Sequence, residues 1–168
     1  MIDPSKKHKK LVSDQLVENR KKSLSLFSGI ENRLEVIKTK DEVTWINDSK
    51  STDIGATAFS LENLDGPLIW IAGYSETKRN LDLINELALE KVDEIICFGN
   101  FETELKYYFA AKIKYSHKAS LHHAVELAAQ NAKKGDTILF SPACTSYLNY
   151  DNYNQRGNHF KELVNKII

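Results

Sequence analysis

The most informative stretch of the sequence is Thr137-Ile138-Leu139-Phe140, followed by Ser141-Pro142-Ala143-Cys144-Thr145-Ser146. The four apolar-rich residues are typical of a buried strand, and Pro142 ends it because proline cannot continue a central ladder. The hydroxyl-bearing residues then lead toward a helix predicted over 153–167. A strand that ends in small polar residues before a helix is typical of the carboxyl edge of an open α/β sheet, where ligands bind.

A second polar loop has the same placement. Val43-Thr44-Trp45-Ile46 predicts a strand, and Asn47-Asp48-Ser49-Lys50-Ser51-Thr52 follows it. The start of the next helix would offer free N–H groups and partial positive charge to a carboxylate or phosphate, and Lys50 would add a full charge. Simple capping of that helix is the alternative interpretation. Two such loops in one domain suggest a single site lined by both.

The remaining chain alternates between strand and helix patterns. A hairpin is predicted from 34–38 and 43–46, with further strands at 68–72, 94–98, 113–116 and 137–140. Helices are predicted over 9–27, 53–63, 80–90, 101–111, 119–133 and 153–167. This order indicates an α/β fold with a mostly parallel sheet flanked by helices, and the leading hairpin adds an antiparallel edge.

Composition narrows the function classes. The 168 residues include 42% hydrophobic and 27% charged residues with zero formal net charge, which disfavours a dedicated nucleic-acid binder. Residues 1–30 hold seven Lys/Arg against three Asp/Glu, and a solvated tail is favoured there over contact with nucleic acid or membrane. No apolar run suits a membrane span or a signal peptide, and Cys97 and Cys144 lack CxxC spacing. We therefore expect a cytoplasmic monomer.

Three other features of the sequence give weaker evidence for a functional site. The loop from Gly73 to Asn80 contains Lys78 and Arg79, which favour either solvated cations or an anion site at the same sheet edge. Cys144 is disfavoured as a nucleophile because no histidine lies near it in sequence with an orienting partner. The five histidines are scattered, so no metal site is predicted, and the chain contains no GxxxxGK[ST] loop.

Two long motifs resemble the Mur ligase family. Trp45-Ile46-Asn47-Asp48-Ser49-Lys50-Ser51-Thr52 is similar to its W-x-N-D-S-K-x-T segment. Ser141–Ser146, with Asn152-Tyr153-Asn154-Gln155-Arg156-Gly157-Asn158-His159-Phe160, resembles its C-terminal signature, and Gly29–Glu35 resembles its linker G-x-x-H-R-x-E. The resemblance covers roughly residues 23–168. It implies a Rossmann-like C-terminal domain over 31–168, with 1–30 as a tail plus the last helix and linker of a missing central domain.

The resemblance also implies a reaction. Within the family, the S-P-A-C-x-S motif points to the ATP-dependent ligase that adds D-glutamate to UDP-N-acetylmuramoyl-L-alanine in peptidoglycan synthesis. ATP would phosphorylate the substrate carboxylate, and the amine of D-glutamate would attack the acyl phosphate. The full-length enzyme would use ATP and magnesium. The P-loop and the magnesium ligands would belong to a missing central domain, and an N-terminal UDP-binding domain would also be missing. We therefore expect this chain alone to need no cofactor and to have no ligase activity.

Family roles carry over to eight positions. The implied nucleotide-binding residues are Arg33 near the phosphates, Asp48 near the ribose, and Asn32, which stands where the family's linker has histidine. Lys50 is implied as the catalytic lysine that stabilises the phosphates and the acyl phosphate. The positions implied to bind D-glutamate are Thr52, Lys78, Ser146 and Tyr153, the last replacing a phenylalanine whose backbone contacts the amino acid.

One loop departs from the family pattern. The family's G-G-x-x-K loop is altered here to Ala72-Gly73-Tyr74-Ser75-Glu76-Thr77-Lys78, so the alignment of Lys78 with the family's lysine stays open. Two alternative functions also stay open. The chain could belong to another amide ligase of the Mur and folylpolyglutamate synthetase type that adds a different amino acid. It could also be a stand-alone α/β binding module without chemistry.

Overall fold

One six-stranded sheet forms the centre of the domain. The computed structural model describes residues 29–168, so the helix predicted over 9–27 and nearly all of the predicted segment 1–30 lie outside the described residues. The strand order is β1-β2-β6-β3-β4-β5, with β1 antiparallel to β2 and every other pair parallel. The strands are β1 (Glu35–Lys40), β2 (Val43–Asn47), β3 (Leu68–Gly73), β4 (Val92–Phe98), β5 (Lys114–Lys118) and β6 (Thr137–Phe140).

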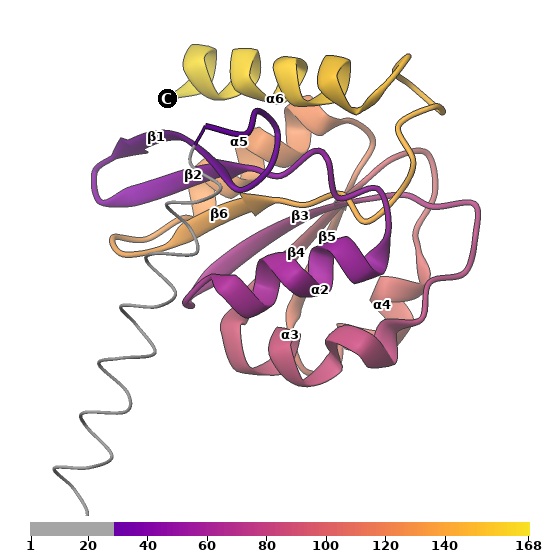
Figure 1. Ribbon diagram of the computed structural model, residues 1–168. Coiled ribbons are helices and arrows are strands. Elements are labelled where there is room, and N and C mark those ends of the chain that lie inside the picture. Colours follow the sequence, from indigo (N-terminus) through magenta and orange to yellow (C-terminus); the bar gives the residue numbers. More distant parts are fainter. Residues whose placement is uncertain (1–28) are drawn as a thin grey trace, which may run out of the picture.

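Helices cover both faces of this sheet (Figure 1). The helices on one face are α2 (Ile54–Asn63), the 3₁₀ turn η1 (Leu81–Ile84), α3 (Asn85–Lys91) and α4 (Glu104–Phe109). The opposite face carries α5 (Leu121–Asn131) and α6 (Tyr153–Ile167). The predicted α/β architecture with a mostly parallel sheet and an antiparallel edge hairpin is therefore confirmed.

Strand β3 shows why the core has two halves. All six of its residues are buried, as expected for a strand covered on both faces. Because side chains alternate along a strand, Trp70 packs with the α2, α3 and α4 layer, whereas Ile69 and Ile71 pack with the α5 and α6 layer. The continuous apolar run of β3 thus supplies both hydrophobic layers.

The helix predicted over 119–133 is observed over Leu121–Asn131, and two other predicted helices are shorter because they begin later. The stretch 80–90 begins as the turn η1, where the N–H of Asn85 bonds to the carbonyl of Asp82, and becomes α-helical only from Asn85. The helix expected over 101–111 starts at Glu104 because Thr103 is still extended, with φ −116° and ψ 169°. Apolar periodicity indicated both helices but not these local backbone choices.

The connections diverge around β6. Strands β2 and β3 lie on either side of it and lead into helices on one face, whereas β6 leads into α6 on the other face (Figure 1). Adjacent strands whose connections leave on opposite faces open a crevice at their carboxyl ends. The loops after β2, β3 and β6 therefore meet where a ligand site is expected.

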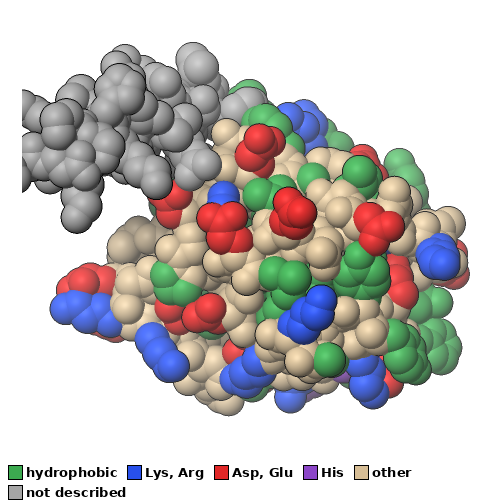
Figure 2. Space-filling model, turned by 90° about the horizontal axis from the view of Figure 1, so that it is seen from below, with side chains coloured by type: hydrophobic (Ala, Val, Ile, Leu, Met, Phe, Trp, Pro, Cys, Tyr) green, Lys and Arg blue, Asp and Glu red, His purple; other side chains and the backbone are tan. Residues whose placement is uncertain are grey.

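The surface over α2, α3 and α4 is mixed in character. Figure 2 shows acidic, basic and apolar side chains interspersed over this face. None of the helices within residues 29–168 is long and apolar enough to cross a membrane.

Candidate functional site

Direct backbone bonds join the three loops at the carboxyl edge. The N–H of Asp48 bonds to the carbonyl of Phe140 at 2.8 Å, and the N–H of Ala143 bonds to the carbonyl of Ser51 at 3.0 Å. The N–H of Gly73 bonds to the carbonyl of Pro142 at 2.8 Å. The two loops that the sequence singled out are thus one connected structure, and the β3 loop joins it.

Gly73 is required by this close approach. A Cβ atom at that position would lie 2.5 Å from the Sγ atom of Cys144, well inside van der Waals contact. The altered loop after β3 thus keeps one glycine where the β6 loop crosses it. Burial raises the pKa of the Cys144 thiol, which agrees with the expectation that it is no nucleophile.

Asp48 is a buried hub rather than a surface carboxylate. Its Oδ2 atom accepts hydrogen bonds from the hydroxyls of Ser51, Ser60 and Ser141, and its Oδ1 atom accepts one from the N–H of Leu34 at 3.2 Å. Burial raises the pKa of this carboxyl above its ordinary value, and these hydrogen bonds offset part of the increase. The carboxylate joins the linker, α2 and the end of β6.

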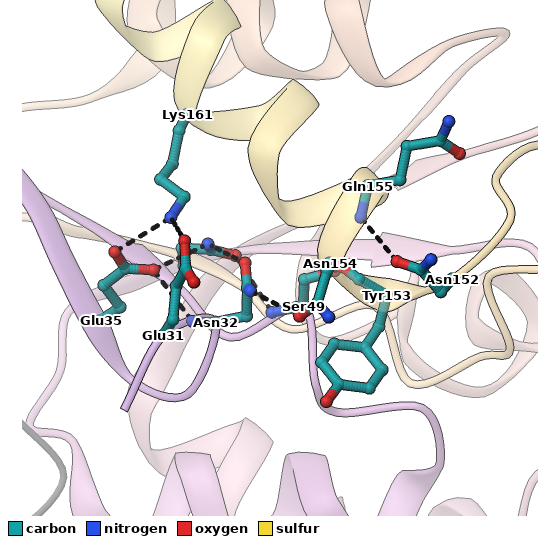
Figure 3. Close-up of polar contacts among 10 residues, drawn as sticks. Glu31, Asn32, Glu35, Ser49, Asn152, Tyr153, Asn154, Gln155 and Lys161 are labelled. Carbon is teal, nitrogen blue, oxygen red and sulfur yellow. Dashed lines mark hydrogen bonds and ion pairs between the residues drawn. The ribbon is translucent and has the colours of Figure 1, made fainter. Parts of the chain in front are cut away.

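Asn32 is also buried and serves an internal network (Figure 3). Its side-chain amide donates to Asn154 at 3.0 Å and accepts from Asn47 at 2.8 Å. Its φ of 63° is a left-handed conformation that asparagine tolerates better than most residues. A Cβ at Gly157 would lie 1.9 Å from the Oδ1 atom of Asn32, so this glycine makes room for the linker against α6.

Ion pairs extend this contact along α6. Lys161 bonds to Glu31 at 2.9 Å and to Glu35 at 3.1 Å (Figure 3). Burial alone lowers the pKa of Lys161, but the bonds to the two glutamates raise it overall. Linker and β1 are thus both fastened to the last helix.

Lys50 occupies the rim of the site. Its N–H bonds to the carbonyl of Asn32 at 3.0 Å, and its ammonium lies 5.7 Å from the centre of the Tyr153 ring. Within residues 29–168 this ammonium has no carboxylate partner, so its charge is free to meet an anion. The ring of Tyr153 attracts the cation without neutralising it.

Thr52 and Ser146 lie on the two joined loops. Thr52 is half-buried just before α2, and its N–H bonds to the carbonyl of Lys50 at 2.9 Å. Ser146 lines a hollow of about 90 Å³ together with Tyr74, Phe101 and Tyr150. Neither hydroxyl has a hydrogen-bond partner within the part of the chain that the structure describes. Both are available to a ligand at the same edge.

Lys78 and Arg33 are less closely tied to this cluster. Lys78 is exposed and lines a different hollow, of about 440 Å³, beside Arg79, Glu104 and Tyr108. Its neighbour Arg79 is buried and bonds to Glu104 at 2.8 Å and to the carbonyl of Gly73 at 3.0 Å. The half-buried side chain of Arg33 makes no hydrogen bond or ion pair within residues 29–168.

Arg156 is the central residue that the sequence reasoning did not select. It is 1% exposed and donates to the Oγ and carbonyl of Ser49 and to the carbonyls of Cys144 and Thr145. Two signals pointed to this position: Arg156 lies within the motif that resembles the family's C-terminal signature, and Gly157 follows it, although glycine is costly inside a helix unless something packs against it.

Comparison with known proteins identifies the family. The sequence model described as "Mur ligase, glutamate ligase domain" matches residues 32–144, two thirds of the chain. The chain belongs to this family.

Curated relatives are D-glutamate ligases. The UDP-N-acetylmuramoylalanine–D-glutamate ligase of Chlorobium chlorochromatii is 36% identical over 90% of this chain and 32% of its own length. The enzyme of the same name from Porphyromonas gingivalis is 38% identical over 86% of this chain and 33% of its length. The chain therefore spans about a third of the curated relatives that it matches.

Solved structures of related ligases share the fold. The MurF ligase of Thermotoga maritima in complex with ADP superimposes with a TM-score of 0.51 at 19% identity, over 82% of this chain and 31% of that chain. A bifunctional folylpolyglutamate synthase/dihydrofolate synthase from Yersinia pestis gives 0.55 at 13% identity, over 79% and 31% of the two chains. At these identities the likeness concerns the fold alone.

Proposed function

We propose that this chain is the C-terminal, amino-acid-binding domain of an ATP-dependent ligase that adds D-glutamate to UDP-N-acetylmuramoyl-L-alanine. The 32–38% identity to ligases of that name carries the proposal. The joined loops that hold Lys50, Thr52 and Ser146 support it. We also propose cytoplasm as the location and a monomer as the working state.

The chemistry proposed for these residues is positioning and electrostatics. An amine must approach an acyl phosphate in line while cations hold the negative charge. Lys50, whose ammonium has no carboxylate partner among residues 29–168, suits that charge. Thr52 and Ser146 would hold the D-glutamate carboxylates, with the backbone of Tyr153 beside them. Lys78 would have to reach them from the neighbouring hollow.

ATP and magnesium fit this domain only in part. Among residues 29–168 the side chains of Arg33 and Lys50 have no carboxylate partner, and they offer positive charge to phosphates. Asn32 and Asp48 are buried and bonded internally, so we propose that these two shape the nucleotide side of the site. Bound ATP would supply the phosphoryl group that activates the carboxylate. Within residues 29–168 no three His, Cys, Asp or Glu side chains converge as metal ligands, so the metal does not fit here and its ligands would come from elsewhere.

A chimera tests the proposal. This chain would replace the matching third of the Chlorobium chlorochromatii ligase, and phosphate release would be measured with ATP, UDP-N-acetylmuramoyl-L-alanine and D-glutamate. We expect activity in the chimera, loss of about 10²-fold or more with Lys50→Met, and none from the chain alone. A folded chimera without activity, or ATP-dependent ligation by the chain alone, would contradict the proposal.

Substrate choice separates this function from a related ligase. D-Glutamate and meso-diaminopimelate would compete as amino-acid substrates of the same chimera. We expect incorporation of D-glutamate only. Preference for meso-diaminopimelate would instead favour another Mur or folylpolyglutamate-type ligase.

One observation favours a second function, a binding module without chemistry. Lys78 lies in a hollow separate from that of Ser146, which leaves the proposed glutamate site with one cation fewer. If Lys78→Met leaves the D-glutamate KM of an active chimera unchanged, Lys78 is no ligand. If D-glutamate binds the chain but the chimera never turns over, the non-catalytic module is correct.

A further inference from the structure

Arg156 has an unusual set of partners for a buried arginine. Within residues 29–168 no carboxylate pairs with it, although its side chain is 1% exposed. Its Nε atom donates to the Ser49 hydroxyl at 3.1 Å, and Nη2 donates to the Ser49 carbonyl at 2.8 Å. On the other side, Nη1 donates to the carbonyls of Cys144 at 2.9 Å and Thr145 at 3.0 Å.

The positions of these partners are informative. Ser49 directly precedes Lys50, and Thr145 directly precedes Ser146. One planar guanidinium therefore bonds to the residue beside the proposed catalytic lysine and to the residue beside the proposed glutamate-binding hydroxyl. Because the guanidinium group is rigid and planar, it holds the loops after β2 and β6 at a fixed distance from each other as well as joining them.

The first turn of α6 holds the same loop by two more contacts. The Ser49 hydroxyl donates to the carbonyl of Tyr153 at 2.8 Å, and the Tyr153 ring lies beneath the Lys50 ammonium. Tyr153 and Arg156 are three residues apart and share one side of the helix. Gly157, next to them, admits the linker whose carbonyl holds the N–H of Lys50.

We infer that Arg156 is a positioning residue that sets the distance between Lys50 and Ser146, and hence between the acyl phosphate and the incoming amino acid. The effect on the reaction rests on the proposed function. That the guanidinium holds the two loops at a fixed distance does not depend on it. A displacement of about 1 Å between reacting groups is enough to cost on the order of 10²-fold in rate.

The test uses Arg156→Lys, which keeps the positive charge and removes the fork. In the full chimera, we expect kcat/KM for D-glutamate to fall at least about tenfold while KM for ATP changes less than about twofold. Arg79→Lys is the control, because Arg79 is another buried arginine that pairs with Glu104 and does not contact the Lys50 loop; its one bond to the Ser146 loop is a long one, 3.5 Å, to the carbonyl of Ala143. We expect a similar loss of thermal stability there without the D-glutamate effect.

Hydrogen exchange on the unmodified and variant chain gives a readout that needs no activity. In Arg156→Lys the amides of Lys50, Ser51 and Ala143 should exchange faster, whereas the amide of Ile71 in β3 should not. Unchanged exchange in the loops overturns the structural content of the inference. Faster exchange with unchanged D-glutamate kinetics, or equal kinetic losses in the Arg79 control, overturns its role in the reaction. An inactive parent chimera speaks against the proposed function instead.

Discussion

At the residue scale, Gly157 decides how closely the linker approaches α6. In an ordinary helix interior, Gly→Ala stabilises by about 1 kcal/mol. Here the added Cβ would lie 1.9 Å from the Oδ1 atom of Asn32. We therefore predict the opposite sign for Gly157→Ala, a loss of about 1–3 kcal/mol in the free energy of unfolding measured with urea. The control is Asn158→Ala, an exposed neighbour on the same helix, which should change stability by no more than about 0.5 kcal/mol.

The buried carboxyl of Asp48 makes a second prediction at this scale. Because its folded pKa is raised above 3.8, the folded chain binds more protons than the unfolded chain between these two pKa values. Asp48 thus adds stability that is complete below the unfolded pKa and is lost as pH rises through the folded pKa.

Asp48→Asn removes this titration. The difference in unfolding free energy between the wild type and Asp48→Asn should become less favourable to the wild type as pH rises from about 4. Urea unfolding across a pH series measures it. A constant difference, or one that grows with pH, would show that the folded pKa is not raised.

At the scale of elements, α6 is the part that gathers the site. Its first turn supplies Tyr153, Asn154 and Arg156 to the loop and linker, and Lys161 fastens two glutamates further along (Figure 3). Because Glu31 is 67% exposed, its ion pair with Lys161 should contribute little; the pair with Glu35, which is 27% exposed, should supply most of the effect of Lys161.

We predict that Lys161→Met costs less than about 1 kcal/mol at low salt, and that this cost shrinks in about 1 M NaCl, where the Debye length is about 3 Å. Urea unfolding at both salt concentrations measures it. Asn32→Ala, which breaks buried amide bonds, should cost more and keep its cost in salt. Equal salt dependence of the two variants would contradict the view that Lys161 acts through exposed ion pairs and Asn32 through buried hydrogen bonds.

Elements were easier to predict from sequence than contacts. The apolar run of β3 and the proline after β6, Pro142, are local signals. The positions of these strands in the sequence, and of the loops that follow them, could therefore be predicted. The burial of Asp48 depends on three serines, of which Ser60 and Ser141 lie on other elements. No periodicity links residues 49 and 156, so the role of Arg156 became visible only in three dimensions. The motif resemblance included Arg156 but did not give that contact.

At the scale of the molecule, the arrangement of loops predicts where D-glutamate binds. Titration of the chain with millimolar D-glutamate should shift the NMR amide signals of residues 48–53 and 144–153. Lys134, at the opposite end of the sheet beside the β1–β2 turn, is the internal control. Signal shifts concentrated around Lys134 would show that D-glutamate binds elsewhere. Shifts at Lys78 would show that the loop carrying Lys78 is part of the binding site.

The two outer strands have a further consequence. The edge strand β1 contains Lys38 and Lys40 and an irregular register between Val36 and Lys38, while β5 on the other edge contains Lys114 and Lys118. Charges and irregularities on exposed borders discourage two sheets from zipping together into aggregates. We therefore expect the domain to resist aggregation through pairing of its sheet edges.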